Sequence, residues 1–152
     1  MTGELQSGRT DCVAATYQAQ IRVSPRTDLT DEQVNAICDQ IRAVGFAIHN
    51  FFGPGFREKV YERALTHRLR KAGLKVDTQV DVRICDEDGT ELITEVLDLI
   101  VEAVVVVELK AVTDPSTADT AQILGYLKAS CFRHGLLINF GGPTFRIRKF
   151  VV

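Results

Sequence analysis

The spacing of hydrophobic residues first becomes regular near residue 30, where it follows the period of an α-helix. Thr30 and Gln33 match a capping box, in which a hydroxyl and an amide each satisfy a free backbone N–H group. The helical pattern continues to Gly53-Pro54-Gly55, a sequence that ends helices. A second amphipathic pattern predicts a helix over residues 56–72, with Gly73 as its C-terminal cap.

The next segment changes from the helical period to a period of two, which predicts strands. Apolar and polar residues alternate over residues 75–84, so this strand is expected to have one face in water. The sequence DEDG predicts a hairpin turn in which Gly89 supplies a positive φ. A second strand is expected over residues 91–101. Residues 104–112 are apolar on both faces, which indicates a central strand.

The last third of the chain predicts one more helix and two strands. Asp114 or Ser116 is placed to cap the helix. Its buried face is expected to consist of Ala118, Ala121, Leu124, Gly125, Leu127 and Cys131. A buried strand is predicted at residues 135–140 and an edge strand at residues 144–152. We therefore expect an α/β fold with the element order α-α-β-β-β-α-β-β, in which helices flank a central mixed sheet.

The N-terminal region has a different pattern. Residues 1–28 show no sustained period and contain Pro25, so they are expected to form a poorly ordered extension, although YQAQIRV could form a short strand. Residues 29–152 are then expected to form one domain, which suits a chain of 152 residues.

Composition and cysteine spacing bear on the cellular compartment of the protein and on the class of molecule that it binds. The net charge of −2 shows no excess of basic residues, which counts mildly against a nucleic-acid binder. The four cysteines form no CxxC pair, as is typical of reducing compartments. The opening MTGELQSGRTDCV lacks the layout of a signal peptide, and no apolar run is long enough to span a membrane. We expect a cytoplasmic protein that does not enter membranes.

Three charged residues interrupt the apolar strands and are the candidates for chemistry. Glu108 and Lys110 are two residues apart, so their side chains leave one face of the strand. A hairpin would bring Asp98 of the preceding strand beside Glu108. Carboxylate oxygens suit Mg²⁺ or Mn²⁺, and a lysine beside such an ion could activate water or stabilise a phosphate. The alternative is a partly exposed salt-bridge cluster, which is common on sheets.

The same residues resemble a known arrangement. An aspartate, then ExK on the next strand, then a helix with Gln122, is similar to the PD-(D/E)XK nuclease superfamily. Within it, GFREKVY at residues 55–61 resembles the small bacterial and archaeal GxxExxY family. Further similar motifs are GPGF at 53–56, LDLIVE at 97–102, VELKAV at 107–112, AQILGYLKAS at 121–130 and GLLINFG at 135–141. The resemblance covers residues 30–150 and implies a restriction-endonuclease-like core.

The resemblance implies roles for individual residues. Asp98 and Glu108 would hold Mg²⁺ or Mn²⁺, and Glu58 would add a carboxylate near the metal. Lys110 would activate water or the phosphate. Gln122 and Tyr126 would face the same cleft and orient water or substrate. The chain departs from the pattern at two positions, since Asp119 and Gly125 stand where family members often have His and Asn.

Each of these assignments has a plainer alternative. Glu58 is also a favourable acidic residue in the first turn of a helix. Gln122 and Tyr126 also suit an ordinary helix face that hydrogen-bonds to the sheet. Arg146 and Arg148, with Lys149, are candidates for phosphate contacts, and Arg68, Arg70 and Lys71 form a second basic group. A solvated surface is the favoured interpretation of both groups.

Three functions follow from the sequence. The first is a metal-dependent nuclease that hydrolyses phosphodiester bonds of DNA or RNA. The second is a catalytically inactive module that binds nucleic acid or protein on the same fold. The third is a structural dimerisation domain that uses the strands at residues 135–140 and 144–152, and a homodimer is also compatible with the first two.

Overall fold

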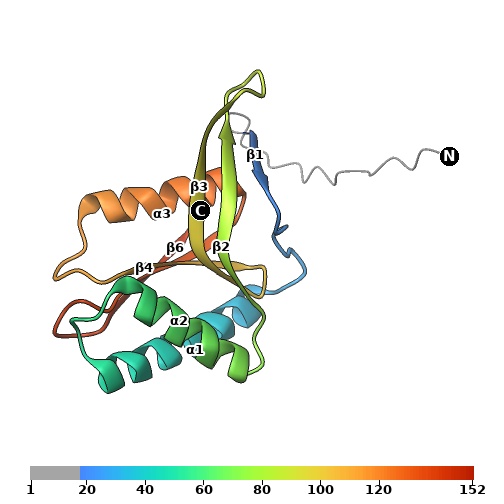
Figure 1. Cartoon of the computed structure of the whole chain (residues 1–152). Coiled ribbons are helices and arrows are strands. Elements are labelled where there is room, and N and C mark those ends of the chain that lie inside the picture. The colour runs from blue at the N-terminus through green and yellow to red at the C-terminus, as the bar shows by residue number, and fades with distance from the viewer. Residues whose placement is uncertain (1–17) are drawn as a thin grey trace.

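The computed structural model describes residues 18–152, and residues 1–17 of the predicted extension lie outside the described part. Three helices and six strands make up the fold (Figure 1). In chain order these are β1 (Gln18–Ile21), α1 (Asp31–Phe52), α2 (Glu58–Lys71), β2 (Val76–Cys85), β3 (Glu91–Val101), β4 (Val105–Lys110), α3 (Thr117–Ser130), β5 (His134–Asn139) and β6 (Arg146–Val151).

The helix boundaries follow the capping residues. The predicted capping box at the start of α1 is confirmed, because the Thr30 hydroxyl accepts from the Gln33 N–H and the Gln33 amide accepts from the Thr30 N–H. Helix α1 ends at Gly53, whose φ of 64° is readily adopted by glycine. Ser116 rather than Asp114 caps α3, and it forms a second capping box with Asp119.

The strands form one mixed sheet in the order β1-β2-β3-β4-β5-β6. Every neighbouring pair is antiparallel except β4 and β5, which are parallel and are joined through α3. A parallel pair needs such a crossover connection. The predicted order of elements and the α/β class are confirmed, and β4 is central as its apolar sequence indicated.

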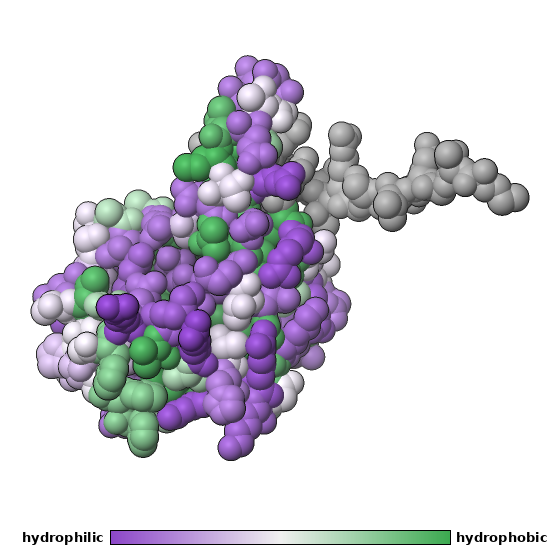
Figure 2. Space-filling model, in the orientation of Figure 1, coloured by the Kyte–Doolittle hydropathy of each residue, from purple (hydrophilic) through white to green (hydrophobic). Residues whose placement is uncertain are grey.

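Helices cover both faces of the sheet and enclose two cores. Helices α1 and α2 lie on one face and α3 lies on the other (Figure 1). Successive residues of β4 alternate between the cores, since Val105 and Val107 face α1 and α2 whereas Val106 faces α3. The β2–β3 hairpin projects beyond the layers, and Figure 2 shows apolar surface on it where Leu92, Ile93 and Val96 are exposed.

Of the predicted buried face of α3, only Leu127 is buried, and Cys131 is half-buried at the C-terminal cap of the helix. Ala118, Ala121, Leu124 and Gly125 are exposed. The buried residues of the helix are Ile123, Tyr126, Leu127, Ala129 and Ser130. Polar Tyr126 and Ser130 can be buried because their hydroxyls are hydrogen-bonded, that of Ser130 to the Tyr126 carbonyl at 2.6 Å. A face defined by hydrophobicity alone could not include them.

The described part of the predicted extension packs against the domain. Strand β1 lies within YQAQIRV and pairs with β2 at the edge of the sheet. Val23 is buried, and the Arg26 N–H donates to the Ala103 carbonyl at 2.8 Å. Among residues 18–152, no helix has the length and hydrophobicity needed to cross a bilayer.

Candidate active site

The β2–β3 ladder is interrupted where Gln79 stands opposite Asp98. Hydrogen-bonded pairing joins Thr78 to Leu99 and Val80 to Leu97, and the residues between them form no pair. Gln79 has a φ of 49°, an unusual backbone conformation for a residue other than glycine. The side chains on either side of this interruption also belong to different cores. Leu99 packs in the core under α1 and α2, whereas Leu97 packs in the core under α3. The interruption therefore places Asp98 at the boundary between the two cores.

Asp98 and Glu108 are neighbours across the next strand pair. The β3–β4 ladder ends at Leu99 and Val107, so one further step along each strand reaches Asp98 and Glu108. Beyond that point the Asp98 carboxylate accepts the Leu109 N–H at 2.9 Å, in place of a backbone carbonyl of β3. The juxtaposition that the hairpin predicted is therefore present.

Lys110 is held among three acceptors from two elements. Its Nζ donates to Gln122 Oε1 at 2.9 Å and lies 3.6 Å from the Glu108 carboxylate and 3.5 Å from the Asp119 carboxylate. The network continues along α3, where the Gln122 amide donates to the Tyr126 hydroxyl at 2.8 Å. The predicted proximity of Lys110, Gln122 and Tyr126 is therefore observed.

Two glutamates of α2 face this cluster from the opposite face of the sheet. Glu58 is the first residue of α2, and the charge of Asp98 is among the causes that raise its pKa. Glu62, one turn later, is 5% exposed and accepts from Lys59 at 3.0 Å and from the Gln79 amide at 3.1 Å. The unusual backbone of Gln79 thus directs its amide to a buried carboxylate beside the site.

The carboxylates share an environment that opposes their ionisation. Burial, followed by the negative charge of Asp98, raises the pKa of Glu108 to about 8, and Lys110 opposes this shift. Burial also raises the pKa of Asp98, against the hydrogen bond from Leu109. Burial is again the first cause of the raised pKa of Glu58. A cation at this position would relieve the repulsion among these groups.

The carboxylates of this cluster differ in how well they suit a bound metal ion. Within residues 18–152, no three His, Cys, Asp or Glu side chains already lie close enough to hold an ion together. Glu108 Oε2, however, is buried without a hydrogen-bond partner in this part of the chain. An unpartnered buried carboxylate oxygen is costly, and Mg²⁺ commonly takes only one or two carboxylates together with water and phosphate. The pair Asp98 and Glu108 therefore fits such an ion, and Glu58 is not gathered with them as a third ligand.

Arg146 and Arg148 lie on β6 and have no hydrogen bond or ion pair with these carboxylates. Arg146 is paired with Asp114 at 2.8 Å, and Arg148 donates to Thr120 at 3.2 Å and lies over the Phe150 ring. Their contact with phosphate stays a prediction.

Four residues around the site had no role predicted from the sequence, namely Glu62, Gln79, Glu95 and Asp119. The position of Glu62 four residues after Glu58 put both on one helix face, which could have identified it. The pairing of Asp119 with Lys110 followed from nothing in the strand pattern, because it depends on how α3 crosses the sheet.

The metal-free protein is expected to lose stability as the pH rises from about 5 to above 8. Folded Glu108 keeps its proton to about pH 8, whereas the unfolded chain releases it near 4.5. The folded state therefore binds more protons in this window, and stability falls as pH increases. In EDTA, Glu108→Gln should match the original protein near pH 5 and exceed its free energy of unfolding at pH 9.

Urea denaturation at pH 5, 7 and 9 measures this difference. Glu87→Gln in the exposed hairpin turn is the matched control and should leave the pH dependence unchanged. If Glu108→Gln is less stable than the original protein at pH 9, ionised Glu108 does not destabilise the fold, and the prediction is wrong.

The α/β fold, with a carboxylate–lysine cluster at the end of its central strands, is that of a restriction-endonuclease-like domain. A model of the PD-(D/E)XK nuclease superfamily matches residues 35–150. The chain belongs to this superfamily, and its helices and mixed sheet are consistent with the restriction-endonuclease-like fold. Members generally use divalent metals and act on nucleic acid. Searches of curated proteins and of solved structures gave no significant match.

Proposed function

We propose that this protein is a nuclease that hydrolyses phosphodiester bonds of DNA or RNA and depends on Mg²⁺ or Mn²⁺. The observation that supports this most strongly is Glu108, a buried carboxylate with one oxygen unpartnered in the described chain, beside Asp98 and Lys110. We also propose membership of the GxxExxY family, supported by GFREKVY at residues 55–61.

Asp98 and Glu108 would hold the metal, and Glu58 would add a carboxylate to the metal's surroundings. A bound divalent ion supplies Lewis-acid polarisation of the phosphate and lowers the pKa of coordinated water. The chain's own groups then position the reactants. Lys110 is held by Gln122 and Asp119, and its ammonium would stabilise the negative charge that develops on the phosphoryl oxygens. Gln122 would also orient water.

Cleavage of labelled single-stranded, duplex and branched oligonucleotides tests this proposal. Cutting is expected with Mg²⁺ or Mn²⁺, and none in EDTA. Glu108→Gln should reduce cutting by at least about 100-fold, because the metal loses a charged ligand, whereas exposed Glu87→Gln should cut normally. Equal cutting by Glu108→Gln and by the original protein would reject the assignment of the site.

Metal binding gives a separate measurement that needs no substrate. Because an ion must displace the Glu108 proton, Mg²⁺ or Mn²⁺ should raise the melting temperature more at pH 8.5 than at pH 6. The melting temperature is measured with and without about 10 mM metal, a concentration that saturates sites of ordinary affinity. Glu108→Gln should show no metal-dependent shift at either pH.

A further inference from the structure

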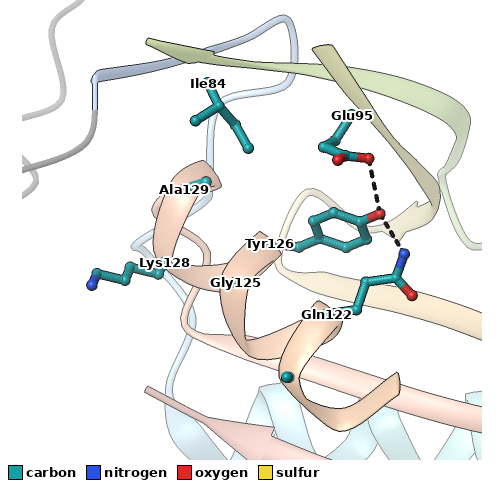
Figure 3. A pocket seen from close by; sticks show the side chains of 8 residues that line it. Ile84, Glu95, Gln122, Gly125, Tyr126, Lys128 and Ala129 are labelled. Atoms are coloured by element: carbon teal, nitrogen blue, oxygen red, sulfur yellow. Dashed lines mark hydrogen bonds between the residues drawn. The ribbon is translucent and has the colours of Figure 1, made fainter. Parts of the chain in front are cut away.

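A pocket of about 320 Å³ lies between α3 and the arm formed by β2 and β3 (Figure 3). Apolar side chains of Ile84 and Ala129 form part of its wall, and Gly125 leaves one side open. Polar groups of Glu95, Gln122 and Tyr126 converge on it. Its volume is near the lower end of the roughly 300–1,000 Å³ typical of ligand pockets, which suits one small planar group.

The pocket adjoins the candidate active site through Gln122. The carbonyl oxygen of that amide accepts from Lys110 at 2.9 Å, and its nitrogen donates to the Tyr126 hydroxyl at 2.8 Å. A group in the pocket would therefore lie one side chain away from the lysine. If the reacting phosphate lies beside Lys110, the pocket is within reach of the base of a nucleotide that flanks this phosphate.

We propose that this pocket is a subsite for a single unpaired nucleobase next to the phosphate that is cut. The proposal rests on the proposed nuclease function and names its substrate class as single-stranded or locally unpaired nucleic acid. Enzymes that receive an extruded base enclose it between apolar or aromatic side chains and read its edge with hydrogen bonds. Ile84, Ala129 and Tyr126 supply the first of these features.

Glu95 supplies the second feature and sets a preference among bases. Its Oε2 lies 3.4 Å from the Tyr126 hydroxyl, and no described residue hydrogen-bonds to its Oε1. A carboxylate only accepts hydrogen bonds, so it favours bases with an exocyclic amino group. Adenine, cytosine and guanine have such a group, whereas thymine and uracil offer only an imide N3–H, which lies between two carbonyl oxygens that repel the carboxylate. The subsite should therefore prefer adenine, cytosine or guanine over thymine or uracil.

Gly125 allows the pocket to be filled without disturbing the site. A Cβ added at Gly125 meets nothing within 4 Å, so Gly125→Leu places a side chain in open space above the pocket. Gly125→Ala is the matched control, because it makes the same backbone change with a methyl group. Both variants are made in a Glu108→Gln background, so binding is measured without cleavage.

Fluorescence anisotropy with 12-nucleotide homopolymers tests the subsite. With Gly125→Ala, oligo(dA) and oligo(dC) should bind about tenfold more tightly than oligo(dT), as one base contact is worth roughly 1–3 kcal/mol. Gly125→Leu should remove this preference, and so should Glu95→Gln. Abasic linkers in place of all bases should weaken binding to Gly125→Ala and leave binding to Gly125→Leu unchanged.

The outcomes separate the two proposals. Equal binding of all oligonucleotides by Gly125→Ala and Gly125→Leu would overturn the subsite, even if the original protein cuts. Stronger binding of duplex than of single strands would also overturn it. If base-dependent binding is found but the original protein does not cut, the subsite stands and the nuclease function is rejected.

Discussion

Replacing Lys110 by alanine is expected to lower the rate of phosphodiester cleavage by about 10²- to 10³-fold. The Lys110 side chain is 17% exposed, and its ammonium lies 3.6 Å from the Glu108 carboxylate, 3.5 Å from the Asp119 carboxylate and 2.9 Å from Gln122 Oε1. A cation fixed in this way needs no reorganisation as negative charge develops on the phosphate, and an alanine leaves that charge uncompensated. Single-turnover cleavage at saturating metal measures the loss.

The affinity for metal separates the role of Lys110 from that of Glu108. Removing a positive neighbour should leave Mg²⁺ binding unchanged or stronger in Lys110→Ala, whereas Glu108→Gln should lose binding and cleavage together. Calorimetric titration with Mg²⁺ distinguishes the two. Exposed Lys75→Ala is the matched control and should retain both properties. Wild-type cleavage by Lys110→Ala would remove the lysine from the proposed chemistry.

Much of the fold could be predicted because its signals are local. The capping box at Thr30, the turn at Gly89 and the unbroken valine run before Glu108 each depend on a few adjacent residues. The face of α3 could not be predicted in the same way. Its buried side contains Tyr126 and Ser130, whose burial depends on hydrogen bonds formed only in the folded chain.

The same distinction applies to the candidate site. Asp98, Glu108 and Lys110 could be brought together from strand register, because alternation and a tight hairpin fix which side chains meet. Glu62 and Gln79 could not, since their contact depends on the packing of α2 against the sheet and on the positive φ of Gln79. Glu95 was missed because the hairpin arm curves over α3, which no local pattern indicates.

Gly141→Ala is expected to destabilise the protein by about 3 kcal/mol or more, an effect at the upper end of overpacked sites. A Cβ added at Gly141 would lie 2.2 Å from the Val112 backbone nitrogen and 2.4 Å from the Ala111 carbonyl carbon. Backbone atoms cannot rotate away as a side chain can. The segment is also fixed in place, because the Asn139 side chain accepts from the Val112 N–H at 3.1 Å and donates to the Val112 carbonyl at 2.8 Å.

The displaced segment begins directly after Lys110, so the same change should reach the site. The Phe140 N–H donates to the Lys110 carbonyl at 2.9 Å, and this bond holds the ends of β4 and β5 together. Urea denaturation measures the stability, and cleavage measured well below the unfolding midpoint measures the site. Gly125→Ala is the control, because its Cβ meets open space on a helix and should raise stability by about 0.5–1 kcal/mol. Equal stability of Gly141→Ala and Gly125→Ala would show that the connection between β4 and α3 can move to accept the added methyl group without loss of stability. The position of Lys110 would then not depend on the close contact at Gly141.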